Sequence, residues 1–203
     1  MSIDSIERLE AIYRDAPTPA STVKEIDHIS PEYAALIAAS PFVALATAGP
    51  EGLDCSPRGD VGRVVQVLDP KTLLLPDRRG NNRIDSLRNI IRDARVALLF
   101  LIPGSGTTFR VNGRARITAD PEVLASLAIQ GQPPRTAILI SVETAYFQCA
   151  RAVIRAGLWD PARYVDPSQL PTAGAILASV SAGEVGGRPY AEEWPERAAK
   201  SLW

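Results

Sequence analysis

Short runs rich in apolar residues, bounded by turn-forming residues, occupy the middle of the chain. They lie at 42–47, 53–56, 63–68, 72–75, 95–102, 108–118 and 137–142. Runs of this length between Gly, Pro, Asp and Ser predict β-strands. The turn segments at 49–52, 69–71 and 103–106 join neighbouring runs and therefore predict hairpins. Strands connected mainly by hairpins indicate an antiparallel barrel rather than a parallel α/β sheet.

Helical periodicity is found at the margins of this strand-rich region. Apolar residues repeat every three or four positions over 3–13, which predicts an amphipathic helix. Ser30 and Pro31 provide an N-cap and a proline at the first helical position, so a second helix is expected over 31–39. Further helices are predicted from residue 84 to about 92, after Asp120, from about 147 to 156, and in short pieces near 172–180 and 192–201.

The composition is that of a globular domain with an ordinary core. Of 203 residues, 46% are hydrophobic and 22% are charged, and a chain of this length needs no metal or disulfide for stability. The net charge of -1 gives no overall field that would recruit nucleic acid or an anionic membrane. No apolar run approaches the roughly 20 residues of a membrane span, and the N-terminus lacks a secretory pattern. We therefore expect a cytoplasmic protein.

Cysteine and histidine are scarce. Cys55 and Cys149 are the only cysteines and His28 is the only histidine. We expect the cysteines to stay reduced, and a zinc site would need almost every available ligand, so no metal is expected. A Ser-His-Asp triad would depend on His28, which precedes the first predicted strand, and we interpret it as a solvated or packing residue. The glycine turn at 104–106 leads into a strand, which indicates a hairpin loop rather than a dinucleotide fingerprint.

Arginine dominates the basic residues and is concentrated in two polar segments. Lysine occurs only three times among the 22 basic residues, so arginine supplies the other 19. Residues 76–83, Pro-Asp-Arg-Arg-Gly-Asn-Asn-Arg, follow a predicted strand and precede a predicted helix. Arginine forks, amide donors and the free N–H groups of a helix start are typical of a phosphate site. The segment 56–60, Ser-Pro-Arg-Gly-Asp, and Arg63 would complete such a clamp. The alternative for both segments is a solvated loop.

The order of these motifs resembles the pyridoxamine 5'-phosphate oxidase-like family of FMN-binding split barrels. The resemblance extends over about residues 30–160 and is strongest to a branch with Ser-Pro-Arg-Gly-Asp and Pro-Asp-Arg-x-Gly-Asn-x-Arg motifs. It implies a mainly β fold with flanking helices, a six-stranded antiparallel split β-barrel. It also implies a homodimer with FMN in clefts at the subunit interface. Residues 1–29 would then be a helix and lead-in, and 161–203 an extension packing on the barrel or on the dimer partner.

The resemblance also assigns site residues. Arg63, Val64, Val65 and Gln66 would line the flavin from one strand, with Arg63 facing the phosphate, and Arg58 is a competing phosphate ligand. Asn82 and Arg83 fall where the family places its phosphate ligands. Pro76, Asp77 and Arg78 would meet the isoalloxazine ring and ribityl chain, and Thr108 or Arg110 would reach the flavin of the partner subunit.

Two departures argue against vitamin B6 oxidation. The oxidases of the family that make pyridoxal phosphate carry a basic residue where this chain has Leu68, and they carry an Arg-x-His motif near the C-terminus that is missing here. The resemblance therefore implies an FMN-dependent oxidoreductase of unknown substrate, with hydride transfer at flavin N5 and NADH, NADPH or a small molecule as reaction partner. The alternatives are a non-enzymatic FMN carrier or sensor, whose segment 160–203 covers the flavin, and a barrel that binds deazaflavin or haem.

Overall fold

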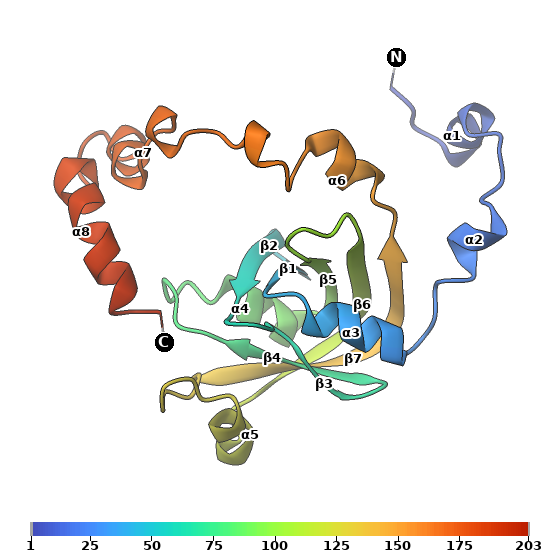
Figure 1. The fold of residues 1–203 in the computed structure, drawn as a ribbon, viewed down its shortest axis with the longest axis horizontal. Helices are drawn as coiled ribbons and strands as arrows, with labels where there is room; N and C mark the ends of the chain where they lie inside the picture. The colour runs from blue at the N-terminus through green and yellow to red at the C-terminus, as the bar shows by residue number, and fades with distance from the viewer. Residues whose placement is uncertain (1, 203) are drawn as a thin grey trace.

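The computed structural model describes residues 2–202 and is built around one curled antiparallel sheet (Figure 1). Its strands are β1 (Phe42–Gly49), β2 (Gly52–Gly59), β3 (Gln66–Asp69), β4 (Thr72–Asp77), β5 (Arg95–Leu101), β6 (Thr108–Thr118) and β7 (Thr136–Gln148). They lie in the order β2-β1-β5-β6-β7-β4-β3, and neighbouring strands pair antiparallel. The predicted split-barrel fold, mainly β with flanking helices, is confirmed. The sheet has seven strands instead of the six that the resemblance implies.

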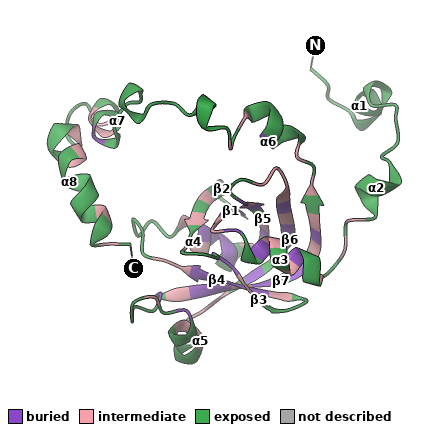
Figure 2. Ribbon diagram, in the orientation of Figure 1, coloured by how far each residue is buried: buried purple, intermediate pink, exposed green. Residues whose placement is uncertain are grey.

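The concave side of the sheet forms the core. Alternate residues of the central strands point inward, so Val43, Phe100 and Phe109 are fully buried. Helix α3 (Pro31–Ala38) begins at the predicted Ser30 cap and buries Ile37 in this core. Helix α4 (Asp85–Arg92) packs on β1 and contributes Ile90. Figure 2 shows the buried residues gathered in the barrel, whereas α1 and α2 are wholly exposed and α7 and α8 are mostly exposed.

Several predicted elements differ in their bounds, and two of the differences have a clear physical reason. The strand expected at 63–68 begins only at Gln66, because the Val64 N–H donates to the Ser40 carbonyl instead of joining the ladder. The helix expected from about 147 is a continuation of β7, since Phe147 and Gln148 pair with Phe109 and Thr108. Helix α6 therefore occupies only Arg151–Ala156.

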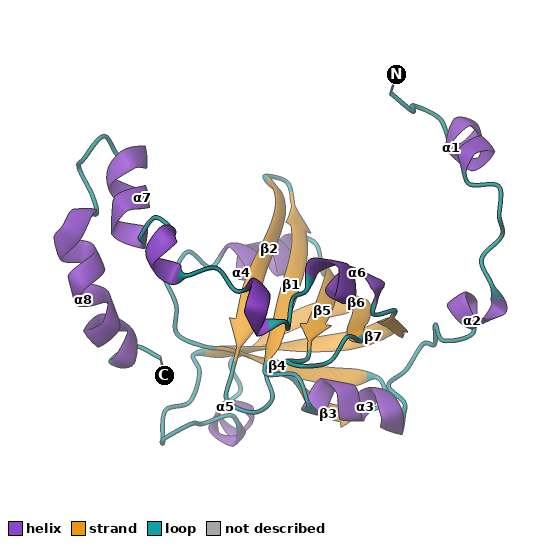
Figure 3. Cartoon of the chain, turned by 45° about the horizontal axis from the view of Figure 1, so that its top comes forward, coloured by secondary structure: helices purple, strands orange, loops and turns teal. Residues whose placement is uncertain are grey.

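The remaining helices are short. Helix α1 (Ile6–Ile12) lies within the predicted 3–13, and α2 (Pro19–Thr22) follows it unpredicted. Helix α5 (Pro121–Ser126) packs on β7. Beyond α6 come two 3-10 turns, η1 (Pro161–Arg163) and η2 (Pro167–Gln169), and then α7 (Ala173–Val180) and α8 (Gly187–Ala199). Figure 3 shows α1, α2, α7 and α8 standing away from the sheet. No helix of the described chain is long and apolar enough to cross a membrane.

Helices α7 and α8 pack against each other through small residues. A Cβ on Gly174 would lie 2.2 Å from the Gly187 carbonyl oxygen, so the two backbones approach as closely as a glycine allows. The pair has no comparable packing on the sheet.

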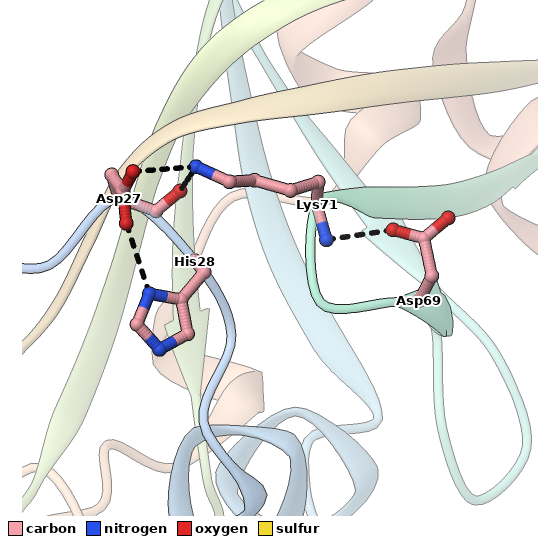
Figure 4. Close-up of polar contacts among 4 residues, drawn as sticks. All are labelled: Asp27, His28, Asp69 and Lys71. Atoms are coloured by element: carbon pink, nitrogen blue, oxygen red, sulfur yellow. Dashed lines mark hydrogen bonds and ion pairs between the residues drawn. The ribbon is translucent and has the colours of Figure 1, made fainter.

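A surface cluster ties the lead-in to the turn between β3 and β4 (Figure 4). Lys71 Nζ donates to Asp27 Oδ2 at 2.7 Å, and Asp27 Oδ1 lies 2.9 Å from His28 Nδ1. The hydrogen bond from Lys71, followed by that from His28, lowers the pKa of Asp27 to about 2. His28 thus lies at the surface, away from the arginine-rich segments.

Candidate functional site

A polar cleft of about 460 Å³ opens beside the carboxyl end of β4. Three segments form its walls: one face of β2, the stretch from the end of β4 to the start of α4, and the loop before β7. The lining residues are Asp54, Ser56, Arg58, residues 77–86 and residues 132–135. The two arginine-rich segments identified in the sequence therefore meet in one place.

Two crossed ion pairs join these walls. Arg58 Nη1 lies 2.5 Å from Asp77 Oδ1, and Arg78 Nη2 lies 2.7 Å from Asp60 Oδ2. β2 is one edge of the sheet and β4 is next to the opposite edge, so the pairs connect the two ends of the strand order. All four side chains are less than one-fifth exposed, and Asp60 is only 4% exposed. Removing one partner of either ion pair would leave the other side chain with an unpaired, poorly solvated charge.

Ser86 anchors Arg58 from the first turn of α4. Its hydroxyl donates to Asp54 Oδ2 at 2.6 Å and accepts from Arg58 Nη2 at 3.1 Å. Ser56 Oγ lies 2.8 Å from the same hydroxyl. The Arg58 Nε, in contrast, is buried and has no hydrogen-bond partner among the described residues. The guanidinium is therefore firmly positioned but incompletely satisfied, which is unusual for a buried polar group and common at functional sites.

The cleft carries more positive than negative charge. Five arginines line it, against three aspartates. Arg58, Arg78 and Arg83 have carboxylate partners, whereas no salt bridge of the described residues involves Arg79 or Arg135. These two exposed side chains lie on the 77–86 stretch and on the 132–135 loop. The excess charge favours an anionic ligand.

The backbone that leads into α4 is strained, and the first turn of the helix is uncapped. Asn82 and Ile84 have φ values of 60° and 54°, in the left-handed region. Ile84 is the N-cap residue, and no side chain caps the first N–H groups of α4. The Arg83 Nε donates to Asp85 Oδ2 at 2.7 Å, which raises the pKa of Arg83 above its usual value. An uncapped helix start beside arginine and asparagine is a suitable binding place for phosphate.

A second hollow of about 140 Å³ lies beside the cleft and shares Arg78 with it. Arg63, Val64 and Gln66 line it together with Pro76, and residues 126–129, which begin with the last residue of α5, close it. Val65 is absent from this lining because its side chain is 1% exposed and belongs to the core.

Apart from Val65, the predicted site residues thus fall into three places. Arg58, Asp77, Arg78, Asn82 and Arg83 lie in the cleft, and Arg63, Val64, Gln66 and Pro76 lie at the neighbouring hollow. Thr108 and Arg110 do not join them. Arg110 pairs with Tyr146 and Asp77 with Thr136, so ten residues of β7, or roughly 33 Å, separate the two positions.

Sequence reasoning missed several cleft residues. Asp54 alternates with Ser56 and Arg58 of the 56–60 segment on one face of β2, and this period of two was a usable signal. Ser86 follows the 76–83 motif in the first turn of α4 but carries no pattern of its own, and only the closure of the barrel brings Arg135 to the cleft. Within residues 2–202, no group of three His, Cys, Asp or Glu side chains is arranged to hold a metal ion.

A family model described as pyridoxamine 5'-phosphate oxidase matches residues 29–149. The curled antiparallel sheet places the chain among the split barrels, and this match covers more than half of the chain. The protein belongs to the pyridoxamine 5'-phosphate oxidase family. No curated protein matches it.

Several solved structures are similar to this chain at low identity. HupZ of Group A Streptococcus is 18% identical, with 60% of this chain and 94% of that chain covered and a TM-score of 0.49. A structure titled putative pyridoxamine 5'-phosphate oxidase from Lactobacillus delbrueckii is 23% identical over 60% and 95%, with a TM-score of 0.48. An FMN-binding protein from Syntrophomonas wolfei is 14% identical over 70% and 91%, with a TM-score of 0.45.

Proposed function

We propose that this protein binds FMN and acts as an FMN-dependent oxidoreductase on a substrate other than pyridoxamine phosphate. The observation that carries the proposal is the meeting of Arg58, Asp77, Asn82 and Arg83 in one cleft at the uncapped start of α4, in a chain of this family. The barrel of residues 30–160 would be the cofactor domain, and residues 1–29 and 161–203 its extensions.

The donor set fits a phosphorylated flavin. Asn82 and Arg83 would hold the phosphate together with the N–H groups of α4, because this is where amide, guanidinium and helix-start donors coincide. Arg58 and Arg78 are held by carboxylates, so their part is to shape the wall that meets the ring and ribityl chain. The cleft volume lies within the range of small-molecule sites.

Hydride transfer at N5 is the chemistry that FMN supplies when bound. The residues of this chain would bind and orient the cofactor and place positive charge close to the ring. Arg78 has such a position, between the cleft and the hollow that Arg63 and Gln66 line. A fixed guanidinium there would stabilise negative charge on the reduced ring.

The outward face of the sheet supports a homodimer with flavin at the subunit interface. Ala44, Leu99, Arg110 and Tyr146 lie in one row across β1, β5, β6 and β7. Leu99 is 37% exposed, although it lies in the middle of the sheet. Thr108 and Arg110 lie on this face, far from the cleft of their own chain. Contact with a flavin would therefore require a second copy.

Two features favour a substrate other than pyridoxamine phosphate. Leu68, at the position where the oxidases carry a basic residue, is half-exposed on the edge strand β3. His28 is bound to Asp27 on the lead-in and lies outside both the cleft and the hollow.

Comparing FMN with riboflavin tests the proposal, since the two differ only in the phosphate. FMN should raise the melting temperature more than riboflavin does. Arg83→Ala should weaken FMN binding roughly tenfold or more, because a charge-assisted hydrogen bond is lost. Arg188→Ala, on an exposed pair of α8, is the matched control and should bind FMN normally. No stabilisation by FMN would overturn the proposal.

Anaerobic reduction separates an enzyme from a carrier or sensor. Bound flavin in the oxidoreductase should be reduced by NADH or NADPH and reoxidised quickly when an acceptor is added. A flavin that neither donor reduces, and that stays unreactive when reduced chemically, would favour the carrier.

A further inference from the structure

The exposed apolar surface of the described chain is concentrated in its two ends. We define the N-terminal arm as residues 2–25 and the C-terminal arm as residues 160–202. Of the 23 large apolar side chains that are exposed, 14 lie in these arms, including Ile6, Ile12 and Trp194. Apolar surface on this scale is typical of segments that are buried in an assembly.

Helices α1, α2 and α8 bury little apolar surface as they stand. Helix α1 has seven residues and α2 has four, and neither buries a side chain. Isolated helices shorter than roughly 12–15 residues are marginal in water, so they form in proteins by packing an apolar face. Helix α8 is longer but also has no buried residue, and its Trp194 ring is half-exposed beside Arg197. These helices therefore need a surface that their own barrel does not provide.

Both arms leave the barrel at the end of the sheet that carries the turn between β5 and β6, close to the row of Ala44, Leu99, Arg110 and Tyr146. The N-terminal arm ends just before Ile26, which pairs with Ala145 of β7, next to Tyr146. The C-terminal arm starts after Trp159, whose Nε1 donates to the Ser105 carbonyl in the turn between β5 and β6 at 2.7 Å. From these anchors the N-terminal arm runs outward, whereas the C-terminal arm arches past the ends of β1 and β2 to the other side of the barrel, and α7 and α8 pack on no strand to an extent comparable with their own contact (Figures 1 and 3). A molecule docked on the outward face would thus lie next to the points where both arms leave the barrel.

We infer that the two arms clasp a second copy of this chain, which docks on the outward face of β1, β5 and β6. The inference rests on the proposed homodimer and adds that the arms pack in trans. Charge supports this occupant: residues 4–15 contain four acidic and two basic side chains, whereas the outward positions of β6 include Arg110, Arg114 and Arg116. In a two-fold dimer the same face and the same arms serve both copies.

Amide hydrogen exchange on dimeric and monomeric protein tests the inference. The variant Leu99→Glu places a charge on the outward face, and Leu68→Glu is the matched control on the edge strand β3. Light scattering gives the size of each protein, and the absorbance of bound flavin is recorded on the same samples. Wild type and Leu68→Glu should be dimers with slow exchange in α1 and α8. Leu99→Glu should be a monomer in which these helices exchange as fast as an unfolded peptide, while β5 and β6 stay protected.

The other outcomes overturn the inference. Protected arms in a monomeric Leu99→Glu would show that they pack on their own barrel, and unprotected arms in a wild-type dimer would show that they dock nowhere. A Leu99→Glu protein that remains dimeric would exclude the outward face as the docking surface between the two copies. If Leu99→Glu does not fold, dilution of wild type replaces it, and arm protection must fall as the dimer dissociates. Flavin absorbance without slow exchange in the arms would leave the cofactor proposal intact and refute only the inference that the arms pack on a second copy.

Discussion

Arg58 and Asp77 form an ion pair, with Nη1 and Oδ1 2.5 Å apart, that links the two ends of the strand order. The pair is part of the cleft wall and is less than one-fifth exposed. It therefore has two consequences, one for the stability of the barrel and one for the shape of the cleft.

Removal of one partner should destabilise the fold. Asp77→Ala leaves Arg58 with an unpaired, poorly solvated charge, and we expect a loss of about 3 kcal/mol in the free energy of unfolding. The double variant Arg58→Ala/Asp77→Ala should lose less than the sum of the two single changes. Urea unfolding measures all three. The exposed pair of Arg188 and Glu192 is the control, with a coupling of about 0.5 kcal/mol or less. If the losses in the free energy of unfolding for Arg58→Ala and Asp77→Ala simply add in the double variant, the ion pair does not stabilise the fold.

Ser86 should affect both stability and ligand binding. Ser86→Ala removes the donor to Asp54 and the acceptor for Arg58, so unfolding should become easier by about 1–2 kcal/mol. FMN affinity should also fall, since Arg58 loses its anchor. Thr22→Ala removes an exposed hydroxyl that donates only within α2 and lies outside both the cleft and the hollow, and it should change neither quantity appreciably. Unchanged FMN affinity in Ser86→Ala would separate this network from the binding site.

Gly49 is required by the packing of α4 on β1. A Cβ at this position would lie 2.2 Å from Asn89 Oδ1, and the Asn89 Nδ2 donates to Thr47 Oγ1 at 3.1 Å. Gly49→Ala should therefore destabilise the protein by about 1–3 kcal/mol through overpacking. Gly80→Ala, where the added carbon meets nothing within 4 Å, should be neutral. Thermal unfolding of the two variants makes the comparison, and equal melting temperatures would contradict the packing argument.

The carboxyl groups of Asp27 and Asp93 should contribute stability that is lost in acid. Hydrogen bonds from Lys71 and Arg95 lower their pKa values to about 2, below the usual 3.8. A lowered folded-state pKa adds stability that is present above about pH 4 and is lost as the pH falls toward 2. Carboxyl NMR titration should find the pKa of Asp27 back toward 3.8 in Lys71→Ala, with that of Asp93 unchanged. An Asp27 pKa that stays near 2 in this variant would exclude Lys71 as the main cause.

Most of the fold could be read from local sequence. The hairpin turns and the Ser30 cap predicted β1, β2 and α3, and the helical spacing of apolar residues from 84 on predicted α4, because these elements depend on neighbouring residues. The start of β3 was missed because the Val64 N–H is taken by Ser40, 24 positions away in sequence. The end of β7 was missed because its pairing with β6 overrides the local helical pattern.

The site was predictable only in part, for a similar reason. The 76–83 motif is continuous, so its position before a helix was visible in the sequence. The crossed ion pairs join residues 18 and 19 positions apart, and they exist only once the sheet has curled. The same closure brings Arg135 to the cleft from a loop that carries no motif.

The absorption spectrum of the freshly purified protein tests the central claim most directly. We predict the visible bands of an oxidised flavin, with FMN as the compound released on denaturation and close to one FMN per chain. A colourless protein that gains no such spectrum when FMN is added would contradict the account.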